Sequence, residues 1–235
     1  MFNTEPPSEL LDQLKISNQL SNLVISYSNI GVWNRFAYAE NTKCEYVCIF
    51  DDDTIPGQGW LESCLSEMDK KKGLYGTVGI KFKSNLEYLD NIRLGWPSHN
   101  ETVEEVDIVG HSWFFKREWL KYYWSETKPA YGYDFMGEDM HFSYALQVYA
   151  GLKTYVPPHP ASQREIWGSL YGQKLGTDKD AISMTAKAFK MNTAFRLQSK
   201  GWILLKDLHS FKIKIWRFFT TSDPSERGKY GGYKA

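Results

Sequence analysis

The sequence predicts an α/β fold in which a mixed sheet is flanked by helices. The first observation is the run at residues 46–50, which is short and rich in β-branched and aromatic residues, as is typical of a buried strand. The second is that three carboxylates, Asp51, Asp52 and Asp53, follow this run at once. The third is that further strand-like runs alternate with amphipathic helical segments, the order typical of α/β proteins.

Composition narrows the class of protein. The chain has 235 residues, enough to bury a full core, and its 28 basic residues balance 28 acidic ones. This balance gives nucleic-acid binding no electrostatic support, so we expect no nucleic-acid partner. The three cysteines are odd in number and lack the CxxC spacing of zinc sites, which favours a reducing compartment. No run approaches the roughly 20 apolar residues of a spanning helix and no secretory signal opens the sequence, so we expect a cytoplasmic location.

The segment before the acidic run predicts a strand-helix-strand unit. A short helix capped by Ser8 comes first, followed by a strand at residues 23–27, a turn, and a helix at residues 32–39. We expect the strand at 23–27 to lie parallel and next to the acidic strand, with a right-handed crossover. On the crossover helix, Arg35 can reach a phosphate or an acid, or can equally form a surface salt bridge.

The acidic triplet predicts a cation site. Ligands in open α/β sheets bind at the carboxyl ends of strands, and three adjacent carboxylates repel one another unless a cation compensates them. Mg²⁺ or Mn²⁺ suits such a site, because each takes oxygen ligands and shares its coordination with phosphate oxygens. The alternative is a solvated helix cap, since Thr54, Pro56 and Gly57 follow as turn residues.

The middle of the chain predicts a helix at residues 60–68 and strands at 74–82 and 103–115, separated by a polar stretch near 95–100. Another helix is expected to begin at Lys116. Within the second strand region, Gly110 precedes His111 and allows the backbone to approach a ligand closely, or forms a plain bulge.

A second pair of acids, Glu138 and Asp139, is expected in the first turn of a helix. A carboxylate there can accept the proton of an attacking hydroxyl, and the alternative is that the pair stabilises the helix terminus. Farther on, His159 follows a short strand that ends in prolines, and it is a candidate additional ligand for a metal or phosphate.

The C-terminal tail, residues 193–235, is expected to be separate from the domain at 1–192. It carries nine Lys and Arg residues against three Asp and Glu. Its apolar residues recur at helical spacing, which suits either peripheral contact with an anionic membrane or packing against the domain. This apolar stripe consists of Leu204, Leu208, Phe211, Ile215 and Phe218.

Taken together, these motifs resemble those of nucleotide-sugar glycosyltransferases of the GT-A fold. The resemblance is carried by Asn34-Arg35, by residues 50–54 with the sequence FDDDT, by residues 108–115 and by residues 137–140 with the sequence GEDM. The FDDDT motif is similar to that of exostosin-type N-acetylhexosaminyltransferases, and the Glu-Asp pair to that of bacterial family 2 glycosyltransferases. The resemblance covers about residues 8 to 190, and residues 166–170 and 176–178 also look like the segment that follows the core in bacterial relatives.

The resemblance implies a role for each motif. The donor would be a nucleoside diphosphate sugar, most simply a UDP-sugar, the acceptor a saccharide, and the cofactor Mn²⁺ or Mg²⁺. Asp53 would hold the metal, and Asp51 would contact the metal or the nucleotide ribose. His159, from its place after a strand, is the candidate for a further metal ligand. The donor would be bound by Asn34, Arg35, Asp51, Asp52 and His111. Asp139 would be the catalytic carboxylate, with Glu138 beside it.

The resemblance is incomplete at the N-terminus, because the first strand, turn and helix of the family, which grip the nucleotide base, have no counterpart in this sequence. Two other functions therefore stay open. One is a non-catalytic carbohydrate-binding remnant of such an enzyme. The other is a metal-dependent nucleotidyltransferase or phosphotransferase, since these also use clustered aspartates at a strand end.

Overall fold

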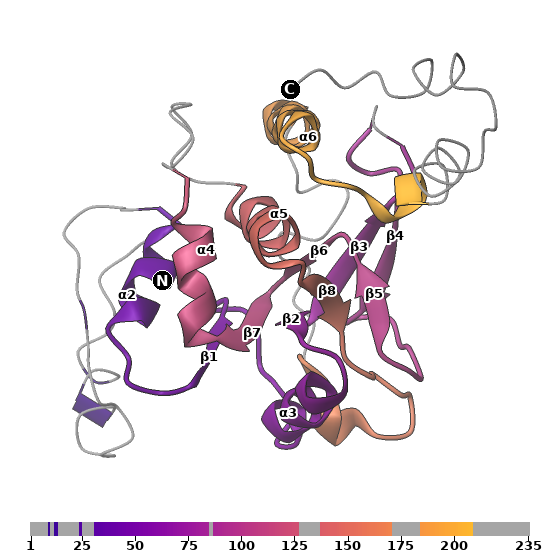
Figure 1. Ribbon diagram of the computed structural model, residues 1–235. Helices are drawn as coiled ribbons and strands as arrows, with labels where there is room; N and C mark the ends of the chain where they lie inside the picture. Colours follow the sequence, from indigo (N-terminus) through magenta and orange to yellow (C-terminus); the bar gives the residue numbers. More distant parts are fainter. Residues whose placement is uncertain are drawn as a thin grey trace, which may run out of the picture.

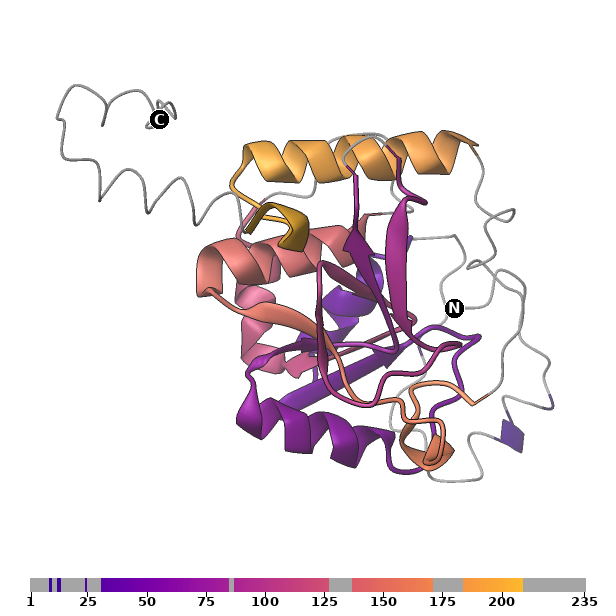
Figure 2. The same ribbon diagram turned by 90° about the vertical axis from the view of Figure 1, so that its right-hand side faces the viewer.

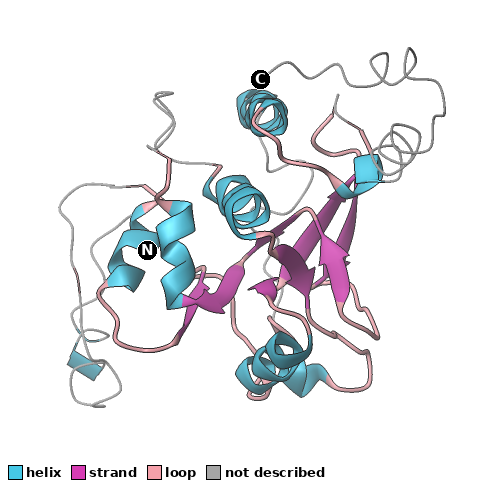
Figure 3. Cartoon of the chain, viewed as in Figure 1, coloured by secondary structure: helices cyan, strands magenta, loops and turns pink. Residues whose placement is uncertain are grey.

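The computed structural model of the protein describes residues 31–84, 87–126, 137–170 and 184–208, with the single positions 9, 12, 13 and 24 (Figure 1). The expected helix after Ser8, the expected strand at 23–27 and the expected segment at 176–178 lie outside the described residues. So does most of the C-terminal tail. What is described is a mixed α/β structure whose sheets are mostly antiparallel and partly parallel, flanked by helices (Figure 3).

Two sheets form the centre of the structure. The larger has the strand order β1-β7-β2-β8-β5, and within it only β2 and β8 run parallel. Its strands are β1 (Tyr46–Phe50), β7 (Ser112–Lys116), β2 (Gly73–Tyr75), β8 (Lys153–Val156) and β5 (Glu104–Val106). The smaller sheet is antiparallel with the order β4-β3-β6. Its strands are β4 (Asn91–Gly95), β3 (Val78–Phe82) and β6 (Ile108–Gly110).

Helices cover both sides of the larger sheet. Figure 1 shows α3 on one side and α4 and α5 on the other, while Figure 2 shows α6 running across the outer side of α5. The helices are α2 (Asn34–Glu40), α3 (Trp60–Lys70), η1 (Arg117–Trp119), α4 (Leu120–Tyr123), α5 (Glu138–Ala150), η2 (Arg164–Ile166) and α6 (Met184–Ser199). None of these described helices combines the length and apolar character needed to cross a bilayer.

An aromatic core joins the helices to β7. Phe36 of α2 packs against Trp113 and Phe115. These two residues lie two positions apart on β7, so their side chains point to the same side of the sheet. Tyr123 of α4 and Phe142 of α5 complete this layer, with ring centroids 4.5 and 5.3 Å from that of Phe36. The high aromatic content of the sequence is therefore used in large part to fill the core.

Two expected strands are each divided in the structure. Residues 74–82 form β2 and β3, which belong to different sheets, with Gly76 at the break. A Cβ at Gly76 would lie 2.4 Å from the Val109 side chain and 2.6 Å from the Ser112 carbonyl, so only glycine fits there. Residues 103–115 form β5, β6 and β7. Strand β4 was not expected at all, because it is short and borders the polar stretch.

Within the described residues, the neighbour of β1 is β7, and the two strands are antiparallel. The register places Phe50 opposite Ser112, so the acidic end of β1 meets the start of β7. The expected parallel partner at 23–27 is outside the described residues.

Helix α6 runs without a break across the position of the expected domain boundary after residue 192, and the described chain beyond it packs into the core. Ala194, Leu197, Trp202 and Leu204 are buried against Ile80, Phe82 and other residues of the second hydrophobic cluster. Leu204 is the first residue of the proposed amphipathic stripe, so the stripe begins as core. Its remaining members beyond Leu208 lie outside the described residues.

Candidate metal and acid–base site

The acidic end of β1 is fixed by the sheet. The Asp51 N–H donates a hydrogen bond of 2.9 Å to the carbonyl of His111, which lies between β6 and β7. His111 has φ +64°, a left-handed backbone conformation that non-glycine residues seldom adopt and that therefore often marks a functional position. The Thr54 N–H donates a hydrogen bond of 3.1 Å to the Asp51 carbonyl. The resulting turn places Asp53 on the same side as Asp51 and His111.

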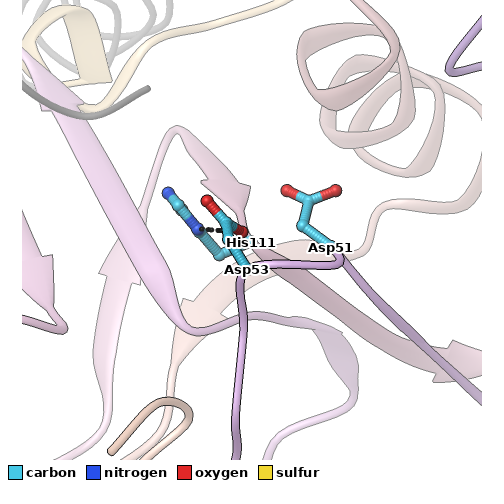
Figure 4. A group of neighbouring side chains, drawn as sticks. All are labelled: Asp51, Asp53 and His111. Carbon is cyan, nitrogen blue, oxygen red and sulfur yellow. Dashed lines mark ion pairs between the residues drawn. The ribbon is translucent and has the colours of Figure 1, made fainter. Parts of the chain in front are cut away.

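Three potential metal ligands converge at this turn. Ligand atoms of Asp51, Asp53 and His111 all lie within 4.8 Å of one another, and all three residues are partly buried. The His111 Nδ1 is 3.5 Å from an Asp53 carboxylate oxygen, and Figure 4 shows the Asp51 carboxylate to one side of this pair. Asp52, the middle residue of the triplet, is exposed and outside the group.

The donor set fits a divalent cation. Two carboxylates supply hard oxygen donors and compensate the positive charge, and one imidazole supplies a nitrogen donor. Mg²⁺ sites use oxygen ligands almost entirely, whereas first-row transition ions also accept imidazole. Of the two cations expected from the sequence, the three residues therefore suit Mn²⁺ better than Mg²⁺.

Arg35 connects this group to the start of α5. Its Nη1 contacts an Asp51 carboxylate oxygen, and its Nη2 lies 3.8 Å from a Glu138 carboxylate oxygen. Its Nε donates to the Val32 carbonyl at 3.0 Å, and its guanidinium carbon is 4.8 Å from the centroid of the Trp113 ring. Arg35 was expected to bind the donor nucleotide, and in the structure its guanidinium group lies between two carboxylates.

Glu138 is the more deeply placed of the two acids. Helix α5 begins after Gly137, which has φ +92°, and Glu138 in its first turn is only 8% exposed. Burial and the adjacent Asp139 raise the pKa of Glu138 to about 7, although Arg35 and Lys190 act in the opposite direction. A carboxyl group that titrates near neutrality is suited to general acid–base catalysis.

The hydroxyl of Tyr123 belongs to the same surroundings. It is buried without a hydrogen-bond partner among the described residues. Burial, and then the charge of Glu138, raises the pKa of Tyr123 well above its usual value, so the phenol keeps its proton. The sequence did not mark this tyrosine, because a tyrosine in an aromatic core is more often structural.

Asp139 has a different set of contacts from Glu138. Its Oδ1 accepts the Met140 N–H at 2.8 Å, and its Oδ2 lies 3.5 Å from the Nζ of Lys190 on α6. Each of the two neighbouring acids thus has its own cation. Lys190 was not predicted from the sequence. The available signal was its spacing from Ala194 and Leu197, which puts this lysine on the apolar face of α6.

The expectation that His159 is a metal or phosphate ligand is wrong. The ring is completely buried, its Nδ1 bonds to the Pro157 carbonyl at 2.9 Å, and its Nε2 accepts the Gly168 N–H at 3.0 Å. Both nitrogens are therefore used, with the proton on Nδ1. Burial lowers the pKa of His159 to about 4, which keeps the ring neutral. It is a structural histidine packed against Trp60 and Trp167.

The predicted site residues thus divide into two sets. Six of them form one connected group that extends from the end of β1 to the start of α5, namely Arg35, Asp51, Asp53, His111, Glu138 and Asp139. Asn34 is the first residue of α2 and adjoins Arg35 in the chain. Asp52 and His159 are not part of the group.

Comparison with models of known protein families and with curated proteins finds no match for this chain. Function is therefore inferred from the side chains of the site and their geometry.

Proposed function

We propose that the protein is a metal-dependent glycosyltransferase, which transfers a sugar from a nucleoside diphosphate donor to a saccharide acceptor. One observation carries the proposal. Arg35 contacts both Asp51 of the cation-binding group and Glu138 of the acidic pair, so the two halves of the expected site are one continuous arrangement. A solvated helix cap at the end of β1 would not need a histidine, an arginine and a second acidic pair beside it.

The chemistry of sugar transfer requires both halves. Bound by Asp51, Asp53 and His111, a divalent cation would supply positive charge for the departing diphosphate. The sugar passes through a state with positive charge near the anomeric carbon, and the carboxylates at the start of α5 stabilise that charge. The oxygen of the acceptor hydroxyl bonds to the anomeric carbon while the bond from that carbon to the diphosphate breaks. Asp139 accepts the proton that the hydroxyl loses.

Binding of Mn²⁺ and UDP tests the proposal. Calorimetric titrations should find that the wild-type protein binds Mn²⁺, and that UDP binds more tightly when Mn²⁺ is present. Asp53→Ala should lose Mn²⁺ affinity. Asp52→Ala is the matched control, since it removes the neighbouring carboxylate of the same triplet but lies outside the group.

Turnover provides the second part of the test. Release of UDP from a panel of UDP-hexoses and UDP-N-acetylhexosamines should depend on Mn²⁺ and on an added saccharide. Equal Mn²⁺ affinity in Asp53→Ala and Asp52→Ala would overturn the cation site. Transfer of the uridylyl group, with release of hexose 1-phosphate in place of UDP, would favour a nucleotidyltransferase.

A further inference from the structure

Lys190 occupies an unusual place for a lysine. It lies four residues before Ala194 and seven before Leu197, both 1% exposed, so it is on the face of α6 that packs onto the rest of the molecule. An ammonium group at such a place loses much of its hydration, and this is costly unless an opposite charge is close. The lysine therefore needs a partner.

Its partners come from two other elements. The Lys190 Nζ is 3.5 Å from Asp139 Oδ2 at the start of α5, and it donates to the Tyr88 hydroxyl at 3.2 Å. It also lies 4.9 Å from the centroid of the Tyr88 ring, in a cation–π arrangement. Burial alone would lower the pKa of Lys190, but Asp139, Tyr88 and Glu138 outweigh it and raise the pKa, so the side chain stays charged.

The consequence for Asp139 is that both of its oxygens are held. Oδ1 accepts the Met140 N–H of its own helix at 2.8 Å, and Oδ2 faces the ammonium group. A carboxylate fixed at both oxygens has one orientation, and orientation to within a fraction of an ångström is what a reacting group requires.

We propose that Lys190, braced by Tyr88, is a positioning residue that orients the Asp139 carboxylate, so that α6 is part of the site. The inference rests on the proposed function, in which Asp139 receives the proton of the acceptor. It extends the site to residues of the chain that no acidic or glycine-rich motif marks.

Four variants test the assignment. Lys190→Met removes the charge and keeps the length of the side chain, Lys190→Arg keeps the charge, and Tyr88→Phe removes the hydroxyl. Lys187→Met is the matched control, because it makes the same change three residues earlier on the same helix, at a partly exposed position.

In turnover assays with Mn²⁺ and the UDP-sugar panel, Lys190→Met should lower kcat by about 10- to 100-fold, the loss expected when a reacting group is misplaced. KM for the donor and the affinity for Mn²⁺ should stay close to wild type. Lys190→Arg should recover most of the loss, Tyr88→Phe should be intermediate, and Lys187→Met should be unchanged. A loss of kcat that Arg does not recover, or that Lys187→Met shares, would overturn the proposal.

A measurement without turnover separates this inference from the proposed function. In ¹H–¹⁵N spectra of lysine ammonium groups, a buried ion-paired lysine exchanges slowly with water and gives a signal at neutral pH. We expect such a signal in the metal-free protein, its loss in Lys190→Met, and its shift or broadening in Asp139→Asn. If no donor is turned over, the proposed function fails, and the lysine signal alone shows whether Lys190 and Asp139 form an ion pair. A signal that Asp139→Asn does not change would overturn the inference.

Discussion

The Asp51 N–H donates a 2.9 Å hydrogen bond to the His111 carbonyl, so two of the candidate metal ligands are joined through the backbone of a sheet. The two residues come from distant parts of the sequence and meet because β1 and β7 pair antiparallel. Their separation is therefore set by strand register and not by loop conformation. A site built on strands has its geometry in place before any ligand arrives.

The first prediction concerns the preference among cations. His111→Asn should lower Mn²⁺ affinity by about 10-fold or more, the scale of effects seen at metal sites. Mg²⁺ affinity should change less, because the amide offers an oxygen in place of the nitrogen. Asparagine tolerates the positive φ of this position, so the backbone should keep its course.

Calorimetric titration with each cation measures this preference. His99→Asn, the same substitution at an exposed histidine, is the control and should leave both affinities unchanged. A parallel loss of Mn²⁺ and Mg²⁺ affinity in His111→Asn would show that the imidazole is not a selective ligand.

The second prediction concerns Glu138 and pH. Because its pKa is raised in the folded state from 4.5 to about 7, the folded protein holds this proton more tightly than the unfolded chain. The stabilisation is fully present below pH 4.5 and is lost as the pH rises through about 7. The free energy of unfolding of the wild type, relative to that of Glu138→Gln, should therefore fall across this range.

Urea denaturation at a series of pH values, with chelator present, gives this difference. Glu62→Gln is the matched control, since Glu62 is an exposed acid in the first turn of α3. Should the difference between wild type and Glu138→Gln stay flat with pH, Glu138 is not the titrating group.

The third prediction distinguishes a structural histidine from a ligand. His159→Ala leaves the buried Gly168 N–H without its partner and should cost about 1–3 kcal/mol, while the Pro157 carbonyl keeps its hydrogen bond from the Asn100 amide. Mn²⁺ affinity should not change in the fraction that remains folded. Denaturation measures the loss of stability and calorimetry the Mn²⁺ affinity, with His99→Ala as the control. A loss of Mn²⁺ affinity without a loss of stability would show that His159 is a ligand.

The same histidine predicts sensitivity to acid. Its pKa is lowered in the folded state from 6.5 to about 4, so the unfolded chain takes up the proton more readily. The stabilisation from the neutral ring is present above pH 6.5 and is lost as the pH falls through about 4. As the pH falls from 6.5 to about 4, His159→Ala should therefore lose less stability than the wild type. Circular dichroism recorded during an acid titration measures this difference.

The fourth prediction concerns α6. Leu197→Ala removes a fully packed side chain from the second hydrophobic cluster and should cost about 2–5 kcal/mol. Phe195→Ala, two residues earlier and 70% exposed, should change stability by less than about 0.5 kcal/mol. Thermal or urea unfolding of the two variants measures the contrast, and equal small effects would mean that α6 is not part of the folded core.

Much of the fold can be read from local patterns. The helix at 60–70 follows from apolar periodicity, and the strand at 46–50 follows from a short run of β-branched and aromatic residues. The division within 74–82 does not, because the residues on both sides of its break are mostly apolar. Gly76 stands at this break for lack of space between Val109 and Ser112, and this is a tertiary contact that no local pattern records.

The sequence marks candidate residues where charges gather at the ends of elements, and it misses those whose partner is distant in the chain. Asp51, Asp53, Glu138 and Asp139 stood out for this reason, although helix capping was the alternative for each group. Lys190 did not stand out, since it is one of many lysines and its partner Asp139 is brought close only by packing of α6 on α5. His159 misled because a histidine after a strand looks available until its two backbone partners are known.

The hydrogen bond from the Leu205 N–H to Asp107 joins residues 98 positions apart, and this connection has a consequence for synthesis. The chain is made from the N-terminus at about 5–20 residues per second, so the sheets and α5 are complete for several seconds before residue 205 exists. During that interval Ile80, Phe82 and Met140 lack their cover and Asp139 lacks its cation. The nascent protein therefore exposes this apolar surface to water until residues 190–205 have been made.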